Sequence, residues 1–299
     1  MKKLRSLMLC LLAGSTHCFL AISAYAAPQV FTPNWAVASA LTEMGHPPIA
    51  MGDKRIYPLW VRVPVQPESV IDAGARYQPN RELLAQLPMT LVLDNFFYAH
   101  LRAVYPPQIP AIDILFDGGN TEPEQHWQSY VDATRNVGDA IGARNEADAY
   151  LRCVENELAN WGADIRQAAP HIKSYVVVQF ADSRQLRIYA ANSMFHVAFD
   201  LMGLQQSDLG RGDRWGNRQI TLKELAQLPD DSCLLVIAPL HRMTEGELAH
   251  SYLWQRMGFG KTRCLRKLPA IWLFGGPDSI RHFADALHHA MLEETQHAP

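Results

Sequence analysis

A short phrase occurs once in each half of this chain of 299 residues. The letters RELLAQLPMTLVLD begin at Arg81, and a near copy, KELAQLPDDSCLLVIAP, begins at Lys223. Each copy is typical of a short helix that carries an exposed glutamate, Glu82 or Glu224, followed by a proline and an apolar strand. A unit that recurs in both halves predicts two lobes of related structure, each with its own sheet.

The strongest helical pattern lies between the two copies. It opens at Asn145, a residue that suits the N-cap of a helix, and stops before Pro170, which cannot continue one. Its apolar residues follow helical spacing: Ala147, Tyr150, Leu151, Val154, Leu158 and Trp161. About 25 residues of helix span roughly 37 Å, which is enough to pass from one lobe to the other.

Strand patterns alternate with helix patterns on both sides of this helix, which is typical of α/β lobes with mainly parallel sheets. We therefore expect an α/β fold of two mainly parallel-sheet lobes, joined by one long interlobe helix, with a ligand cleft between the lobes. The expected divisions are an N-terminal lobe over residues 27–144, the interlobe helix over 145–169 and a C-terminal lobe over 170–299.

The first 26 residues have the pattern of a secretory signal peptide. Three basic residues precede an apolar stretch, and Ala24-Tyr25-Ala26 provides the small residues of a cleavage site. Cys10 and Cys18 do not follow a lipobox, which argues against a lipid anchor. We expect cleavage after Ala26, and no later apolar run has the length needed to span a membrane.

The charge and the cysteines of the remaining chain limit its function. Removing three basic residues leaves 24 basic against 30 acidic side chains, a net charge of −6, with no basic stripe to favour nucleic acid. Three cysteines remain, which allow one disulfide at most. The helical pattern around Cys153 and the strand pattern around Cys233 favour buried small apolar residues, and whether any two of Cys153, Cys233 and Cys264 form a disulfide stays open.

A search for catalytic or metal-binding motifs finds none that fits. The chain has no Gly-x-Ser-x-Gly, Gly-x-Gly-x-x-Gly or paired Cys-x-x-Cys motif, and Gly260-Lys261-Thr262 lacks the earlier glycine of a phosphate loop. His282 and His289 are seven residues apart in a helical pattern, where a solvated helix face is favoured over a metal site. The sequence therefore favours a binding protein without catalytic residues or metal ligands.

One set of side chains does indicate a binding site. Each of its members falls in a loop or at the end of an expected element, where aromatic residues build pockets and an arginine favours a planar anionic group. Any one of them could be a core residue, but five distributed over both halves favour a shared cleft between the lobes. The set consists of Trp60, Arg76, Tyr98, Trp215 and Trp272.

Three blocks resemble the periplasmic ferric-hydroxamate-siderophore binding proteins of Gram-negative bacteria. They are YPLWVRVPVQPESVIDAGARYQPNRELLAQL, GDRWGNRQITLKELAQL and LPAIWLFGG, which occur in the same order. This family belongs to the helical-backbone class of ABC-importer substrate-binding proteins. The resemblance extends over nearly the whole mature chain, and it implies a monomer in the periplasm with two α/β lobes joined by one long helix.

The resemblance also implies roles for the aromatic and arginine set. Arg76 would bond the hydroxamate oxygens, Trp60 would line the N-terminal side of the cleft, and Trp215 and Trp272 would line the C-terminal side. Tyr98 is expected to supply another contact, with Phe97 as the alternative because this stretch matches the family poorly. The ligand is a preformed Fe3+ complex, so the resemblance implies neither a cofactor nor metal ligands on the protein.

In this class one surface glutamate of each lobe docks on the inner-membrane permease subunits, and Glu82 and Glu224 hold the matching positions. Plain solvation of the two helices is the alternative. The single interlobe helix implies only a small closure on ligand binding.

Two residues depart from the family pattern. Asp213 stands where the family has an amide, and Phe274 where it has a tyrosine. The alternatives that remain open are a binder of catecholate siderophores, haem or cobalamin, a periplasmic enzyme, and a structural or adhesion protein.

Overall fold

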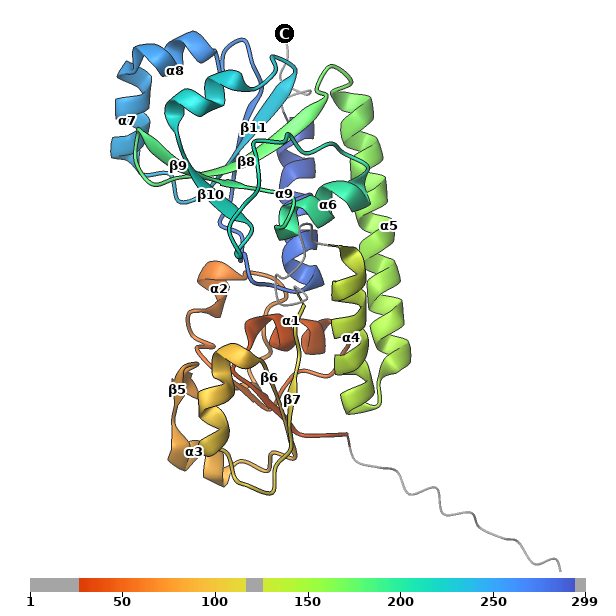
Figure 1. Ribbon diagram of the computed structural model, residues 1–299. Coiled ribbons are helices and arrows are strands. Elements are labelled where there is room, and N and C mark those ends of the chain that lie inside the picture. Colours follow the sequence, from red (N-terminus) through yellow and green to blue (C-terminus); the bar gives the residue numbers. More distant parts are fainter. Residues whose placement is uncertain (1–26, 117–125, 294–299) are drawn as a thin grey trace, which may run out of the picture.

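The computed structural model describes residues 27–116 and 126–293, and the expected signal peptide lies outside them (Figure 1). Two lobes lie one above the other, and helix α5 (Arg144–Ala168) runs beside both of them. It starts one residue before the expected position, with Ala143 in place of Asn145 at its N-cap. Helix α9 (Pro277–Leu292) packs along α5 in the upper half and also contacts α1 of the lower lobe, so α5 and α9 both link the halves of the molecule.

The N-terminal lobe contains a parallel sheet in the strand order β3-β2-β1-β6-β7. Central strand β1 pairs with β2 on one side and with β6 on the other. The strands are β1 (Val30–Thr32), β2 (Ala50–Met51), β3 (Ile71–Asp72), β6 (Leu91–Asp94) and β7 (Ala111–Asp113), with a separate hairpin of β4 (Gly74–Ala75) and β5 (Gln78–Pro79). The helices are α1 (Trp35–Glu43), α2 (Tyr57–Trp60), α3 (Arg81–Gln86), the 3-10 helix η1 (Phe96–Ala103) and α4 (Trp127–Ile141).

The C-terminal lobe has a mixed sheet in the order β10-β9-β8-β11-β12. Strand β11 is parallel to β8 and β12, whereas β9 is antiparallel to β8 and β10. Asp182 causes this reversal, because its carboxylate accepts the backbone N–H groups of Arg184 and Gln185. The strands are β8 (Ser174–Phe180), β9 (Gln185–Tyr189), β10 (Asn217–Thr221), β11 (Ser232–Ile237) and β12 (Leu265–Leu268); the helices are α6 (Met194–Met202), η2 (Leu222–Gln227), α7 (Arg242–His250) and α8 (Tyr252–Met257).

The repeated phrase forms a short helix and then a central strand in each lobe, as the sequence predicts. In the first copy α3 precedes β6, and in the second η2 precedes β11. The first helix is capped by Asn80, whose side chain accepts the N–H of Leu83. The second is a 3-10 helix capped by Thr221 and Glu224, which bond to each other's backbone in a capping box. The glutamate of the second copy therefore helps to cap its helix, whereas Asn80 caps the helix of the first copy.

One apolar core extends through both lobes. It includes buried residues of α1 and α4 in the lower half, of α5 along its length, and of α6, α9 and β11 in the upper half. Gly162 of α5 faces the C-terminal end of α6, where a Cβ atom would overlap the carbonyl oxygen of Met202. This glycine lets α6 pack directly on the interlobe helix.

The interpretation of the cysteines was wrong in part. Cys233 is buried as expected, but it forms a disulfide with Cys264, with their Cα atoms 4.5 Å apart. The parallel pairing of Leu234 with Leu265 places the preceding residues side by side, and the sequence pattern does not tell which strands are neighbours. Cys153 is a free thiol on the exposed face of α5, so the expectation that its side chain is buried is wrong.

The described residues contain no group of three or more His, Cys, Asp or Glu side chains that could hold a metal ion. His289 is exposed as expected, whereas His282 is partly buried, and this burial lowers its pKa. Within the same ranges, no helix combines the length and the apolar character that crossing a membrane requires.

Candidate ligand-binding site

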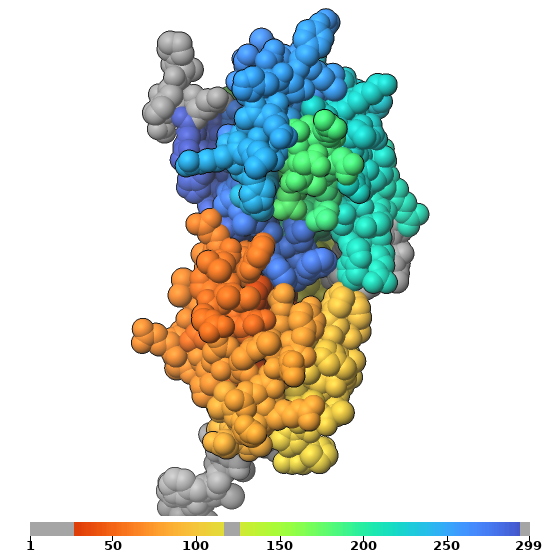
Figure 2. Space-filling model, turned by 90° about the vertical axis from the view of Figure 1, so that its left-hand side faces the viewer, coloured from red at the N-terminus to blue at the C-terminus, as the bar shows by residue number. Residues whose placement is uncertain are grey.

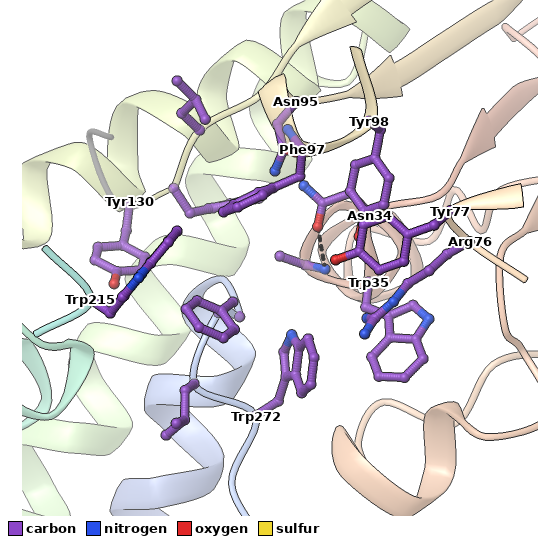
Figure 3. Close-up of a pocket in the computed structure, with 16 residues that line it drawn as sticks. Asn34, Trp35, Arg76, Tyr77, Asn95, Phe97, Tyr98, Tyr130, Trp215 and Trp272 are labelled. Carbon is purple, nitrogen blue, oxygen red and sulfur yellow. Dashed lines mark hydrogen bonds between the residues drawn. The ribbon is translucent and has the colours of Figure 1, made fainter. Parts of the chain in front are cut away.

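A cavity of about 270 Å³ lies between the two lobes. Figure 2 shows the face on which residues 50–80 of the lower lobe meet the upper lobe, and Figure 3 shows the side chains that line the cavity. The walls are mainly aromatic and come from both halves of the chain. The lining residues are Asn34, Trp35, Ala36, Arg76, Tyr77, Asn95, Phe97, Tyr98, Leu115, Phe116, Tyr130, Trp215, Trp272, Leu273, Phe274 and Gly275.

Arg76 lies at the tip of the β4–β5 hairpin, where Ala75 pairs with Gln78 and leaves a two-residue turn. Its guanidinium carbon lies 4.1 Å from the ring centroid of Trp35 and 4.9 Å from that of Trp272 (Figure 3). Only 16% of its side chain is exposed. These ring faces attract the cation and hold the plane of the guanidinium at the cavity wall.

Trp35 forms the floor beneath this arginine. It is 1% exposed, and its indole Nε1 donates a hydrogen bond of 2.8 Å to the carbonyl oxygen of Gly52. The ring also packs against Trp272, with centroids 4.9 Å apart. Asn34 caps α1 and so fixes the point at which the chain leaves β1 and enters the cavity wall.

Phe97 and Tyr98 both line the cavity, so the structure places the two alternatives side by side. Tyr98 is 5% exposed and stacks on Tyr77, with ring centroids 5.2 Å apart. Burial raises the pKa of Tyr98, so its hydroxyl stays protonated and able to donate a hydrogen bond. Phe97 instead stacks on Trp215 of the opposite lobe at 5.6 Å, which joins the two sides of the cleft.

Trp215 is held by a turn that depends on Asp213. One oxygen of the Asp213 carboxylate accepts the backbone N–H of Trp215 at 2.8 Å and that of Asn217 at 3.2 Å. Gly216 has a φ of +72°, and a Cβ there would overlap the carbonyl oxygen of Asn192. Asp213 therefore shapes the turn, and it does not line the cavity.

The remaining sequence-predicted residues take different places. Trp272 lies in the cavity wall, with the departing residue Phe274 edge-on to it at 5.9 Å. Trp60 does not line the cavity; it is 44% exposed and packs edge-on behind Trp272 at 6.4 Å. Glu82 and Glu224 lie outside the cavity, on α3 and η2.

The two glutamates have different surroundings. Glu82 is exposed, and no ion pair or hydrogen bond of its side chain occurs among the described residues. Glu224 lies 3.2 Å from Arg218, and the N–H of Thr221 donates to its carboxylate, which lowers its pKa. Glu224 therefore has partners within its own lobe, whereas the described residues supply none for the side chain of Glu82.

Arg76 is the only charged residue among the described residues that line the cavity. The site can accordingly enclose a ligand with apolar surface and direct hydrogen-bond donors from Arg76 and Tyr98 at oxygen atoms on its rim. The aromatic faces supply most of the contact area.

Comparison with known proteins gives a consistent result, although no family model matches the chain. The iron(3+)-hydroxamate-binding protein FhuD of Escherichia coli is 24% identical over 265 residues, which cover 88% of this chain and 86% of that protein. The siderophore-binding protein FhuD of Vibrio cholerae, solved with Fe3+-Desferal bound, superimposes with a TM-score of 0.76 at 23% identity. That alignment covers 89% of this chain and 98% of the other. The chain has the FhuD fold.

A further FhuD fold-family protein, from Bacillus subtilis, has a TM-score of 0.64 at 13% identity, with 88% of this chain and 97% of that chain covered. It is described as the periplasmic binding protein component of a ferrichrome ABC transporter. By their names, these relatives are binding proteins and not enzymes. The FhuD fold confirms the two-lobed α/β architecture that the three sequence blocks imply.

The strand order of the lower sheet explains why further residues of the cavity wall cannot be recognised from the sequence. Trp35 and Asn95 follow β1 and β6, two neighbouring parallel strands whose connections leave in opposite directions along the sheet. Ligands bind outside the carboxyl ends of parallel strands at such a switch point. The polar residues after two apolar strands, Asn34 and Asn95, were the available signal for this position.

Proposed function

We propose that this chain is the periplasmic substrate-binding protein of an ABC importer that captures ferric hydroxamate siderophores and delivers them to the inner-membrane permease. The observation that carries the proposal is an interlobe cavity with aromatic walls, in which Arg76 is the one charged residue among the described residues of the lining. The relatives support it, because those from Escherichia coli and Vibrio cholerae bind ferric hydroxamates by name or in their solved complex.

The chemistry of such a ligand fits the cavity. Fe3+ is a hard ion that takes oxygen ligands, and a hydroxamate siderophore supplies all of them itself. The protein then has only to hold the outside of a preformed complex. Arg76 and Tyr98 donate to the hydroxamate oxygens, while Trp35, Trp215 and Trp272 pack against the apolar parts of the siderophore. We propose a small closure on binding, since α5 and α9 both connect the lobes.

Tryptophan fluorescence provides the test. Three tryptophans line the cavity, so an iron complex that enters it should quench them. Titration with ferric desferrioxamine B, ferrichrome and ferric aerobactin is expected to give saturable quenching with a Kd near micromolar, about −8 kcal/mol. The iron-free siderophores serve as the control. If the protein binds none of the three complexes but binds haem, cobalamin or a ferric catecholate, the proposed transport role stands and the proposed ligand is wrong.

We further propose that Glu82 and Glu224 contact the two permease subunits. Glu82→Gln is expected to lower siderophore uptake about tenfold in vesicles that contain the cognate permease, because it removes a free charge from the docking face. The Kd for the siderophore should not change. Glu68→Gln removes an exposed charge from the same lobe and should leave uptake intact. Equal uptake by the Glu82 and Glu68 variants would contradict the docking role.

A further inference from the structure

An exposed arginine, Arg214, lies against the aromatic wall that the upper lobe contributes to the cavity. Its guanidinium carbon lies 4.3 Å from the ring centroid of the next residue, Trp215. Trp215 lines the cavity and stacks on Phe97 of the lower lobe, whereas Arg214 does not line it. Figure 3 shows Trp215 on the opposite side of the cavity from Arg76. A ligand that Arg76 holds at one end therefore presents its other end to the ring that carries Arg214.

A tight turn fixes the position of this arginine. The N–H of Asp213 donates to the carbonyl oxygen of Asn217 at 2.7 Å, and the N–H of Gly216 donates to the carbonyl oxygen of Asp213 at 2.9 Å. The side chain of Asn192 donates to the same carbonyl oxygen of Asp213 at 2.7 Å. The backbone of Arg214 is thus held on both sides, and the contact with the indole ring restricts its side chain.

The guanidinium of Arg214 has unused hydrogen-bond donors. Within the described parts of the chain, no oxygen atom accepts a hydrogen bond from this side chain and no carboxylate forms an ion pair with it. The two acidic residues of its loop, Asp208 and Asp213, accept backbone N–H groups of the loop instead. Arg76 differs, because a carboxylate oxygen of Asp53 lies 3.7 Å from its Nε. Arg214 therefore offers a charge without a partner beside the cavity.

A carboxylate is the group that such a side chain recognises best. The planar guanidinium donates two parallel hydrogen bonds to the two oxygens of a carboxylate. An ion pair on an open surface contributes little, because two long side chains lose freedom and water screens the charges. Here the ring of Trp215 already restricts Arg214, and a ligand in the cavity would cover one side of the pair from water. A carboxylate that projects from the bound complex past Trp215 would therefore gain affinity.

We propose that Arg214 is a specificity-determining residue, which makes the protein favour ferric hydroxamates that carry a free carboxylate outside the iron centre. The inference rests on the proposed capture of ferric hydroxamates. Asp208 and Asp213 offset the charges of Arg211 and Arg214 in the same loop, so the preference depends on direct donation by Arg214 and not on the field of the loop. The cavity wall holds the iron centre that all such complexes share, and Arg214 distinguishes among them.

Two derivatives of ferric desferrioxamine B test this preference on one iron centre. Acetylation of its free amine gives a neutral complex, and succinylation of the same amine adds a free carboxylate. The wild-type Kd for the succinyl complex is expected to be about fivefold lower than that for the acetyl complex. Arg214→Gln should bring this ratio to about one and keep the Kd for the acetyl complex within about twofold, because the neutral complex does not use the guanidinium. Fluorescence titration measures both values.

Two further variants separate direct contact from general charge. Arg211→Gln removes the same charge from the same loop and should keep the wild-type ratio. Arg214→Glu should invert the ratio, because its carboxylate repels the succinyl group. A wild-type ratio near one, an unchanged ratio in Arg214→Gln, or an equal loss in Arg211→Gln would overturn the inference. If the wild-type protein binds neither derivative nor the parent complex, the proposed function fails instead.

Discussion

Replacing Arg76 with alanine is expected to raise the Kd for ferric hydroxamates about 10- to 100-fold. The change removes charge-assisted hydrogen bonds that contribute roughly 1.5–3 kcal/mol, and each ~1.4 kcal/mol corresponds to a factor of ten. It also removes the guanidinium that packs on the rings of both Trp35 and Trp272, so the cavity wall loses packing as well as charge. Fluorescence titration of the variant with ferric desferrioxamine B measures the effect.

Two variants give this experiment its controls. Arg76→Lys keeps the positive charge but has neither the planar stack nor the paired donors, so its Kd should fall between those of alanine and the wild type. Arg55→Ala removes an exposed arginine of the same lobe and should bind as the wild type does. If Arg76→Ala binds as tightly as Arg55→Ala, the assignment of Arg76 to the ligand is wrong.

The free energy of unfolding is expected to fall by about 2–4 kcal/mol between pH 4 and pH 7 through one buried carboxyl group, Asp278. Asp278 lies in the first turn of α9 and is 2% exposed. Burial raises the pKa of its carboxyl group from 3.8 to about 7, with the nearby Glu43 adding to the effect and Tyr150, Ser39 and Arg281 opposing it. The folded protein therefore holds this proton more tightly than the unfolded chain does.

The sign of the pH dependence follows from these two pKa values. Below about pH 4 both states are protonated and the stability contribution of the proton is fully present. As the pH rises the unfolded chain loses the proton first, so the stability declines until the folded carboxyl ionises near pH 7, at ~1.4 kcal/mol per pH unit at most. Above that pH this group adds no further change.

Thermal unfolding of Asp278→Asn at pH 5 and pH 8 checks this expectation. Asparagine resembles the protonated carboxyl and cannot ionise, so the variant should lose the decline and be more stable than the wild type at pH 8. Asp285→Asn changes a carboxylate on the same helix whose side chain is 44% exposed, and it should retain the wild-type decline. Parallel pH curves for the wild type and the Asp278 variant would show that another group is responsible.

The sequence predicts the architecture well because its strongest signals are local. The repeated phrase and the helical spacing of α5 each lie within one stretch of chain, and the structure has both. The cavity depends on contacts between distant segments. In the sequence Trp35 has the pattern of a core residue of α1. It lines the cavity because β1 and β6 are neighbours and because the carbonyl oxygen of Gly52 accepts its indole N–H.

The same limit applies to three other residues. Cys233 meets Cys264 through the β11–β12 pairing, which no local pattern reveals. Trp60 belongs to the same sequence block as Arg76, yet α2 carries it behind Trp272 and out of the cavity lining. Residues that share a sequence motif with a site residue therefore lie near the site, but the motif does not determine which of their side chains line it.

The core that passes through both lobes has a consequence for how the molecule unfolds. Residues of α1, α5, α6 and α9 belong to one apolar cluster that spans both halves, beside smaller clusters that lie within each lobe. Loosening the lower lobe exposes apolar surface of the upper one, which couples their melting into a single cooperative event. The two lobes are separate in shape and are connected by α5. Cutting the chain at either end of α5 is not expected to give two halves that fold independently.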